Sequence, residues 1–289
     1  MSTNRLEFVC PACLSSLAGG DDLLKCKKCN ANYHVVDRIP QLISGNFSKN
    51  EAEIQDAAGE DYDNIRYARS YSRAYHDWWS KQIVEYLSKT DLVLDDGCGT
   101  GELAAQMPSE DVVGVDISMG MCFRASKKMH QVLNANSEQL PFRDCVFDAV
   151  ICRGHLHHLP RPEKGISEVS RVLREGGKAI FSEPISSILS TLPRRISRNS
   201  GHFSETHKAF NRTEFLSMIE DSALKISEVR YFGYLAYPLI GFPDVFDLFK
   251  YMPFGASIAP LLIKLDEHIS HIPGVKRHSW AVLVIAHKE

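Results

Sequence analysis

The stretch Leu92-Val93-Leu94-Asp95-Asp96-Gly97-Cys98-Gly99-Thr100-Gly101-Glu102-Leu103 decides the fold of this chain. A short apolar run leads directly into glycine-rich backbone, which is typical of a buried strand whose carboxyl end lets a ligand approach the main chain. In dinucleotide enzymes the spacing is G-x-G-x-x-G, and a pyrophosphate binds at a helix N-terminus. Here two acids end the strand and would repel a pyrophosphate. The stretch therefore favours a nucleotide-like ligand that carries positive charge.

A further acid supports a ligand site at this turn. Asp116 ends the next apolar run, Val112 to Val115, and follows Asp95 by 21 residues. A carboxylate in this place can accept both hydroxyl groups of a ribose. The glycine loop, the preceding strand and the spacing of the acids together predict a binding site rather than a structural turn.

Apolar runs without polar alternation recur after residue 90, as expected of strands that are covered on both faces. Helix candidates at 119–129 and 163–174 lie between them, and another at 213–223 follows. This alternation predicts an α/β fold with a parallel sheet. The predicted strands are 92–94, 112–115, 131–133, 149–151, 178–181, 225–232 and 280–286.

The order of these motifs resembles that of the class I S-adenosylmethionine-dependent methyltransferases. Residues 93–101, 113–118, 140–142, 147–150 and 168–177 carry the resemblance, which covers roughly residues 60 to 230. It implies a Rossmann-like sheet of seven strands and S-adenosylmethionine as the cofactor. By the same resemblance the cofactor-binding residues would be Asp95, Gly97, Cys98, Gly99, Thr100, Gly101, Asp116, Ile117, Asn136, Ser137 and Arg153.

Each of these residues has an expected role. The loop from Gly97 to Gly101 would pass under the cofactor, with Asp95 near its methionine end and Asp116 on its ribose. Asn136 and Ser137 would border the adenine, and Arg153 would line the site after the fourth strand. The family often has Asp where this chain has Asn136, whose amide oxygen could still accept from the adenine amine. A usual proline is replaced by Glu175, in a turn before the fifth predicted strand.

Two C-x-x-C pairs stand near the start of the chain. Cys10, Cys13, Cys26 and Cys29 offer four thiolates, and such a set suits a closed, structural Zn²⁺ site. Free thiols or a redox pair are the alternatives. With residues 33–40 following, the module is similar to the zinc-ribbon domain found alone as an activator of tRNA and protein methyltransferases, where docking of a partner or substrate is its implied role. We expect a zinc ribbon over 1–45, a linker and N-terminal helices over 46–90, and a methyltransferase domain over 91–289.

Candidate proton acceptors follow the fourth predicted strand. His155 and His158 are the predicted catalytic residues, because histidine can take a proton near neutral pH, and a packing role is the alternative. His202 and His207 lie in a segment that often covers the acceptor in this family, and a surface loop is the alternative there. Residues 185–212 are locally basic, which fits either an anionic acceptor or a solvated face.

An apolar, aromatic insert over residues 233–278 is expected to be helical. Such a segment has to cover something, and three interpretations stay open. It could cap the acceptor pocket, form a homodimer contact or rest on a membrane surface as a peripheral contact. A cap over an apolar acceptor is the preferred hypothesis.

The composition is that of an ordinary globular protein. Hydrophobic residues make up 44% and charged residues 24% of the 289 residues, which excludes disordered and coiled-coil classes. The net charge of -3 gives no positive field, so nucleic acid is not favoured as a partner. Without a signal peptide or a bilayer-spanning stretch, a cytoplasmic protein is expected.

The sequence therefore predicts a methyltransferase that acts on oxygen or nitrogen of a small or lipid-like metabolite. One alternative is an rRNA or tRNA base methyltransferase that uses the zinc ribbon for docking. A non-catalytic subunit that binds the cofactor is the other.

Overall fold

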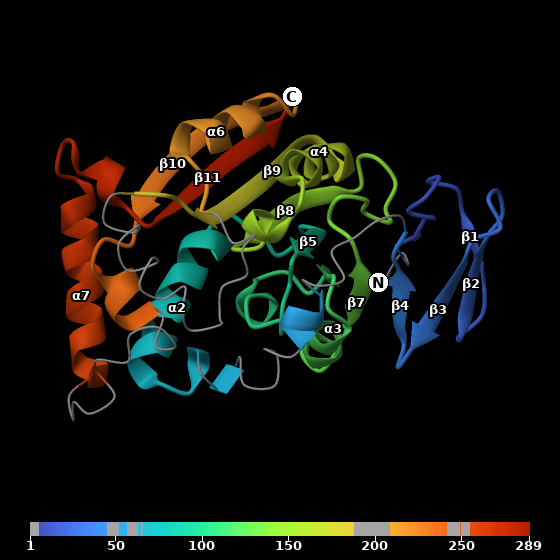
Figure 1. Ribbon diagram of the computed structural model, residues 1–289, viewed down its shortest axis with the longest axis horizontal. Coiled ribbons are helices and arrows are strands. Elements are labelled where there is room, and N and C mark those ends of the chain that lie inside the picture. The colour runs from blue at the N-terminus through green and yellow to red at the C-terminus, as the bar shows by residue number, and fades with distance from the viewer. Residues whose placement is uncertain are drawn as a thin grey trace.

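A mixed sheet of eleven strands forms the centre of the molecule, in the order β1-β2-β3-β4-β7-β6-β5-β8-β9-β11-β10 (Figure 1). The computed structural model describes residues 6–44, 52–56, 63–64, 66–187, 209–241, 249 and 255–289. The strands are β1 Leu17–Gly19, β2 Leu23–Cys26, β3 Asn32–Val36, β4 Ile39–Leu42, β5 Val93–Asp96, β6 Val112–Asp116, β7 Gln131–Ala135, β8 Phe147–Arg153, β9 Leu173–Pro184, β10 Leu224–Phe232 and β11 Ala281–Lys288.

The prediction of a seven-stranded sheet is wrong. Strands β5 to β11 make up the expected α/β sheet, in which β5 to β9 are parallel and β11 runs antiparallel to β9 and β10. The N-terminal module adds four more strands, because β4 pairs in parallel with β7, with Gln41 opposite Asn134 and Leu42 opposite Ala135. Strand β7, which would be an edge strand of the expected sheet, therefore lies between β4 and β6.

Side chains of the central strands alternate between two cores, one on each face of the sheet, as the twofold period of a strand requires. Leu94 and Val150 belong to the core that α4 (Pro162–Val172) and α6 (Arg212–Glu220) cover. Val93 and Ile151 belong to the core that α2 (Ser70–Val84) and α7 (Gly255–Ser270) cover. The carboxyl ends of β5, β6 and β8 lie between these layers.

The N-terminal module joins the sheet through side chains as well as backbone. Leu42 and Ile39 are buried, and Leu42 belongs to the same core as the strands of the main sheet. Val9 N donates to Pro141 O at 2.9 Å, and the side chain of Arg143 donates twice to the carboxylate of Glu7. In Figure 1 the module stands beyond β7, at the end of the molecule opposite α7.

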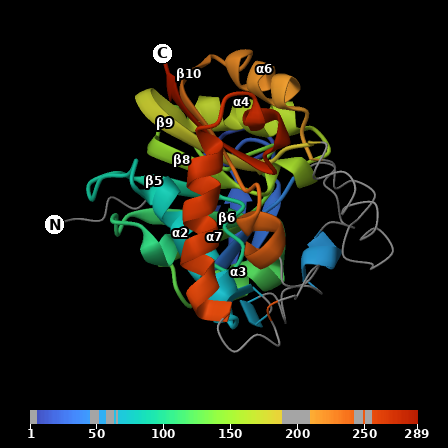
Figure 2. The same ribbon diagram turned by 90° about the vertical axis from the view of Figure 1, so that its left-hand side faces the viewer.

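Helix α7 lies within the predicted insert. It lies on the outer side of the molecule in front of α2 (Figure 2), where Trp78 Nε1 donates to Glu267 Oε1 at 2.9 Å. Buried Asp266 accepts hydrogen bonds from the backbone N–H groups of Tyr234, Leu235 and Ala236. The insert is therefore anchored to α2 and to the end of β10, and its roles as a cap, dimer contact or membrane contact stay predictions.

Several predicted segments fall outside the described residues. They are most of 46–66, the basic segment with His202 and His207 over 188–208, and residues 242–248 and 250–254 of the insert. No helix in the described part of the chain has the length and apolarity needed to span a bilayer.

Candidate functional site

The glycine loop lies at the carboxyl ends of β5 and β6. Gly97, Gly99 and Gly101 have φ of 80°, 53° and 78°, a left-handed conformation that glycine adopts without steric cost. The backbone N–H of Gly97 donates to Val115 O at 2.8 Å, which holds the loop against β6. A Cβ atom on Gly97 would lie 2.3 Å from Cγ of His155, so no larger residue fits there.

Asp116 connects the loops that follow β5 and β6. Its Oδ2 accepts from Gly99 N and its Oδ1 accepts from Ser118 N, both at 2.9 Å. Burial raises the pKa of Asp116, against the opposing effect of these two N–H donors. Ile117 follows in the same turn, and its carbonyl oxygen accepts from Asn134 Nδ2 at 2.8 Å. Since a carboxylate oxygen has a second lone pair, Asp116 can still accept from a ligand.

Asp95 presents a buried carboxylate beside this loop. The residue is 2% exposed, and its Oδ2 has no hydrogen-bond partner among the described residues. Burial raises the pKa of Asp95 to about 7, and the charge of Arg153 opposes that rise. A buried carboxylate oxygen without a donor is costly, so a cationic or hydrogen-bonding ligand would stabilise this position.

Arg153 reaches back to helix α2. Its guanidinium donates to Ser80 Oγ at 3.1 Å and to His76 Nδ1 at 3.2 Å, and it stacks on the Trp79 ring at 4.3 Å from the ring centroid. Nε2 of His76 in turn donates to Gly241 O at 3.2 Å. The guanidinium group of Arg153, which was predicted to line the site, is thus held by helix α2.

The predicted adenine-side residues are engaged with their neighbours. Asn136 is nearly buried, and its Oδ1 accepts from Glu138 N at 2.9 Å. Ser137 Oγ donates to Asp96 Oδ1 at 2.6 Å. Both residues therefore shape the turn after β7, and Asn136 keeps its amide N–H groups and a second lone pair for a ligand.

Of the two predicted catalytic histidines, His155 lies deepest in the site. Its ring packs on Gly97, and its Nε2 lies 3.5 Å from Asp96 Oδ2. Burial would lower the pKa of His155, but the nearby carboxylate of Asp96 outweighs that effect and raises it. The Cys152 Sγ also lies 3.8 Å from Asp96 Oδ2. No ligand-binding or catalytic role was predicted for Asp96 from the sequence.

Glu183 and His157 form a pair that sequence reasoning missed. Glu183 is fully buried at the end of β9, and its Oε1 accepts from the backbone N–H groups of His155 and Leu156, both at 3.0 Å. Its Oε2 accepts from His157 Nδ1 at 2.7 Å, and the ring of His158 lies 4.1 Å from that of His157. The sequence feature that could have indicated this pair is the acid Glu183, which closely follows the predicted apolar strand 178–181.

Two acids of the predicted linker also reach the site. Asp63 Oδ1 accepts from Thr100 Oγ1 at 2.6 Å, and Asp56 Oδ1 accepts from Ser118 Oγ at 2.5 Å and from Gly120 N at 2.9 Å. The sequence predicted only a linker here, and no local pattern assigned these two acids to the site.

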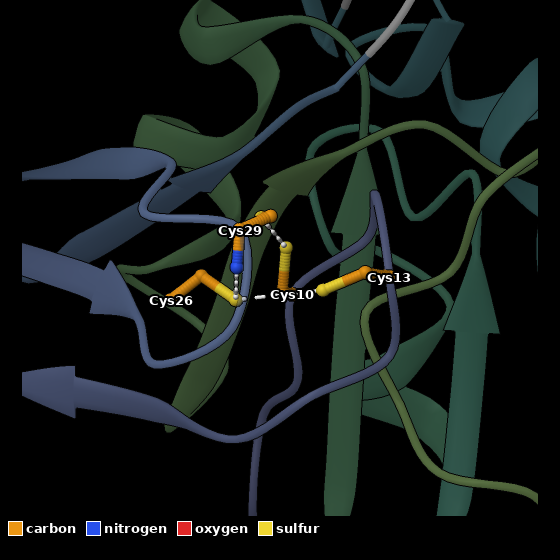
Figure 3. Close-up of side chains that lie close together, drawn as sticks. All are labelled: Cys10, Cys13, Cys26 and Cys29. Carbon is orange, nitrogen blue, oxygen red and sulfur yellow. Dashed lines mark hydrogen bonds between the residues drawn. The ribbon is translucent and has the colours of Figure 1, made fainter.

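The four N-terminal cysteines converge on one point (Figure 3). Their sulfur atoms all lie within 4.8 Å of one another, and Cys10–Cys29 and Cys13–Cys26 are separated by 3.6 and 3.4 Å. Four sulfurs at about 2.3 Å from one zinc ion stand roughly 3.8 Å apart, so the arrangement fits a tetrahedral metal. Burial is uneven, with Cys10 and Cys26 inside and Cys29 exposed.

The methyltransferase domain family matches residues 94–181, which run from β5 into β9. The ubiquinone/menaquinone biosynthesis C-methyltransferase of Syntrophotalea carbinolica is 31% identical over 161 residues, which are 46% of this chain and 68% of that protein. The chain belongs to the class I S-adenosylmethionine-dependent methyltransferases. The tRNA (carboxymethyluridine(34)-5-O)-methyltransferase of Arabidopsis thaliana is 33% identical over 45% of this chain and 31% of that protein.

Other methyltransferases share the fold at low identity. A possible histamine N-methyltransferase from Thermotoga maritima matches 82% of this chain and 99% of its own with a TM-score of 0.57 at 18% identity. A chain in a complex between the Haloferax volcanii Trm112 methyltransferase activator and a putative methyltransferase matches 83% of this chain and 96% of its own, with a TM-score of 0.55 at 14% identity. The chain spans 31% to 58% of the length of the first curated relatives that it matches.

Proposed function

We propose that this methyltransferase transfers the methyl group of S-adenosylmethionine to an oxygen or nitrogen atom of a small or lipid-like metabolite. The observation that carries the cofactor site is the loop of three left-handed glycines next to Asp95, whose buried Oδ2 has no partner among the described residues. A ligand with an ammonium group and a sulfonium would supply the missing positive charge. That chemistry matches the cofactor of the family.

Different residues of the chain would bind different parts of the cofactor. The backbone of Gly97 to Gly101 would lie under it, Asp116 would accept from its ribose hydroxyls, and Asn136 with Ser137 would border the adenine. The cofactor, when bound, supplies an electrophilic methyl group. The protein's contribution is then to align the acceptor and to remove its proton.

The segment from His155 to His158 supplies the proton acceptor. The hydrogen bond from His157 Nδ1 to Glu183 favours His157, because it fixes the tautomer in which Nε2 is the basic atom. His155 and His158 stay candidates for this role. The ring of His158 lies 4.1 Å from that of His157.

The cysteine cluster is proposed to hold a structural Zn²⁺. Cys10, Cys13, Cys26 and Cys29 fill a tetrahedral shell and leave no position for water or substrate. Backbone N–H groups of Lys28 and Cys29 donate to Cys26 Sγ, both at 3.4 Å, as thiolate ligands require. The ion would stabilise a module that is too small to fold on its apolar area.

The acceptor distinguishes this proposal from the RNA alternative. The quinone methyltransferase relative favours a small or lipid-like acceptor and the plant tRNA methyltransferase favours RNA. The net charge of -3 speaks against RNA, because RNA affinity depends on basic surface. The ubiquinone/menaquinone relative is a C-methyltransferase. The same assay therefore also tests carbon as the acceptor atom.

Calorimetry with S-adenosylmethionine tests the cofactor site. The intact chain is expected to bind, and Asp116→Ala is expected to weaken binding by at least about tenfold through loss of two hydrogen bonds. Asp111→Ala removes an exposed acid five positions earlier and should leave affinity unchanged. No binding by the intact chain, or full affinity in Asp116→Ala, would contradict the proposal.

Transfer of radiolabelled methyl groups tests the acceptor. Phenolic, amine, quinol and lipid acceptors are offered beside total tRNA and rRNA. Label in a small molecule supports the proposal, and label in RNA with a steep salt dependence supports the alternative. Cofactor binding without label in any acceptor class would favour a non-catalytic subunit.

A further inference from the structure

We propose that Asp96, Cys152 and His155 form a second metal site, distinct from the N-terminal cysteine cluster, which binds Zn²⁺ or a similar divalent ion below the glycine loop. The carboxylate, the thiol and the imidazole each offer one ligand atom, and these atoms lie within 4.8 Å of one another. Asp96 ends β5 and Cys152 lies opposite it on β8, so the pairing of the two strands brings the side chains to one face. His155 follows in the turn after β8.

The separations of His155 and Cys152 from Asp96 match those between ligands of one metal ion. Asp96 Oδ2 lies 3.5 Å from His155 Nε2 and 3.8 Å from Cys152 Sγ. An imidazole and a carboxylate that bonded directly would stand about 2.8 Å apart. Ligands at roughly 2.0 to 2.3 Å from one tetrahedral ion instead stand about 3.3 to 3.8 Å apart.

The N-terminal cysteines provide an internal standard. Their pairs are separated by 3.4 and 3.6 Å around a point that suits zinc. In the cluster of Asp96, Cys152 and His155, the two separations from Asp96 Oδ2 are of similar length, and the set is a mixed one of oxygen, sulfur and nitrogen. Such a set suits zinc and related divalent ions better than calcium or magnesium, which prefer oxygen alone.

Burial leaves the ring of His155 in need of a partner. Asp96 and Cys152 are fully buried, and both ring nitrogens of His155 are buried without a hydrogen-bond partner among the described residues. Coordination through Nε2 would satisfy one of them. Ser137 Oγ donates to the other oxygen of Asp96 at 2.6 Å, which orients the carboxylate as outer-shell hydrogen bonds do at metal sites.

The local charge also favours a dication. Four buried carboxylates, those of Asp95, Asp96, Asp116 and Glu183, interact electrostatically with His155. Arg153 opposes the negative charge at Asp95, but its guanidinium is engaged by α2. In a site of low dielectric constant such an excess of negative charge is costly, and a divalent ion would offset it.

A site with three protein ligands keeps a fourth position for water or a substrate atom. His155 packs on Gly97, so that position would lie next to the loop assigned to the cofactor. An acceptor hydroxyl or thiol bound there would lose its proton more readily. This role rests on the proposed function, whereas the metal site itself does not.

Metal analysis of the full-length protein after zinc loading and desalting tests the site. We expect about two zinc ions per chain in the wild type and about one in Cys152→Ala and in Asp96→Asn. Cys122→Ala is the matched control, because Cys122 is also buried and its thiol lies by backbone carbonyls, and it should keep both ions. Circular dichroism checks that each variant is folded.

X-ray absorption of the wild type gives an answer even where a variant fails to fold. Two occupied sites predict a mean of about 2.5 sulfur ligands per zinc, and the cysteine cluster alone predicts about four. One zinc per chain with four sulfur ligands would overturn the inference, as would a second zinc that survives both substitutions. S-adenosylmethionine binding, measured separately, reports on the proposed function alone.

Discussion

At the scale of single residues, Gly97 is the point where the strand end, the glycine loop and the histidine segment meet. Replacing it by Ala combines a left-handed φ of 80° with a Cβ that would lie 2.3 Å from His155. Such strain costs about 1 to 3 kcal/mol, and the clash adds to it. We expect Gly97→Ala to lower the free energy of unfolding by more than about 3 kcal/mol and to abolish cofactor binding, as measured by urea unfolding and calorimetry.

Gly274→Ala separates the two contributions. Gly274 has a similar φ of 82°, but a Cβ there would meet nothing within 4 Å. Its loss of stability should be limited to about 1 kcal/mol, with cofactor affinity unchanged. Equal losses in the two variants would mean that His155 does not constrain the loop.

His76 predicts how stability depends on pH. Burial and the neighbouring charge of Arg153 hold the pKa of His76 well below its usual value of 6.5, so the folded state keeps the ring neutral. Because the unfolded chain takes up a proton at His76 below pH 6.5, the contribution of this residue should lower stability by about 1 kcal/mol per pH unit as the pH drops below that value. Urea unfolding between pH 7.5 and 5.5 measures this slope.

His76→Gln is the matched variant, because it removes the titrating ring and keeps hydrogen-bonding groups for Arg153 and Gly241. Its stability should depend less on pH over the same range by roughly one proton. An unchanged slope in the variant would show that other groups cause the acid sensitivity.

The sequence could predict those site residues whose role follows from local spacing. Gly97, Gly99 and Gly101 form a contiguous pattern and Asp116 ends the next apolar run, and the structure brings Asp116 and the glycine loop together at the carboxyl ends of β5 and β6. The pair of Glu183 and His157 joins residues 26 positions apart on different elements. Such a contact depends on how two strands end relative to each other, which no local pattern fixes.

At the scale of elements, Asp266 fixes the insert to the end of β10. Its carboxylate accepts from three backbone N–H groups at 3.0, 2.7 and 3.2 Å, and Asp266→Ala would leave all three without an acceptor. Each unsatisfied buried donor costs about 1 to 3 kcal/mol. We expect a loss of at least about 2 kcal/mol in urea unfolding.

Glu267→Ala is the neighbouring control. Glu267 is exposed, and its side chain accepts from Trp78 Nε1. Its loss should cost less than about 1 kcal/mol. If the two variants were equally stable, Asp266 would not anchor the insert.

Element positions were predictable where periodicity was strong, and their boundaries and long-range pairing were not. Each predicted strand has a counterpart, but β9 begins at Leu173, where the predicted helix 163–174 should have continued. Backbone N–H groups at 145 and 146 bond to Arg171 O and Val172 O, which ends the helix there. The pairing of β4 with β7 joins segments about 90 residues apart, and its register depends on packing rather than on pattern.

At the scale of the whole molecule, the cysteine cluster and the main sheet share one core. Cys10, Cys26 and Leu42 belong to the same buried cluster as β7 and β8, and Ile39 packs with Cys98 of the glycine loop. Loss of the proposed metal from the cluster should therefore destabilise the whole fold. We expect Cys13→Ser to lower the midpoint of thermal unfolding by about 5 °C or more. Tryptophan fluorescence measures this midpoint in the main domain, where Trp79 and Trp280 are buried.

Cys145→Ser serves as the control, because Cys145 is exposed and lies outside the cluster. Its midpoint should match that of the wild type. A Cys13→Ser protein with an unchanged tryptophan transition would show that the module and the main sheet unfold independently.

The strand β4 also bears on self-association. Without residues 39–42, the backbone groups of β7 would form an open parallel edge, a template on which other chains can add strands. At the far end, β10 is interrupted by an irregularity between Ile226 and Glu228 and carries Lys225 and Arg230, features that discourage such growth. A fragment that begins after residue 44 is thus expected to aggregate where the longer chain stays dispersed.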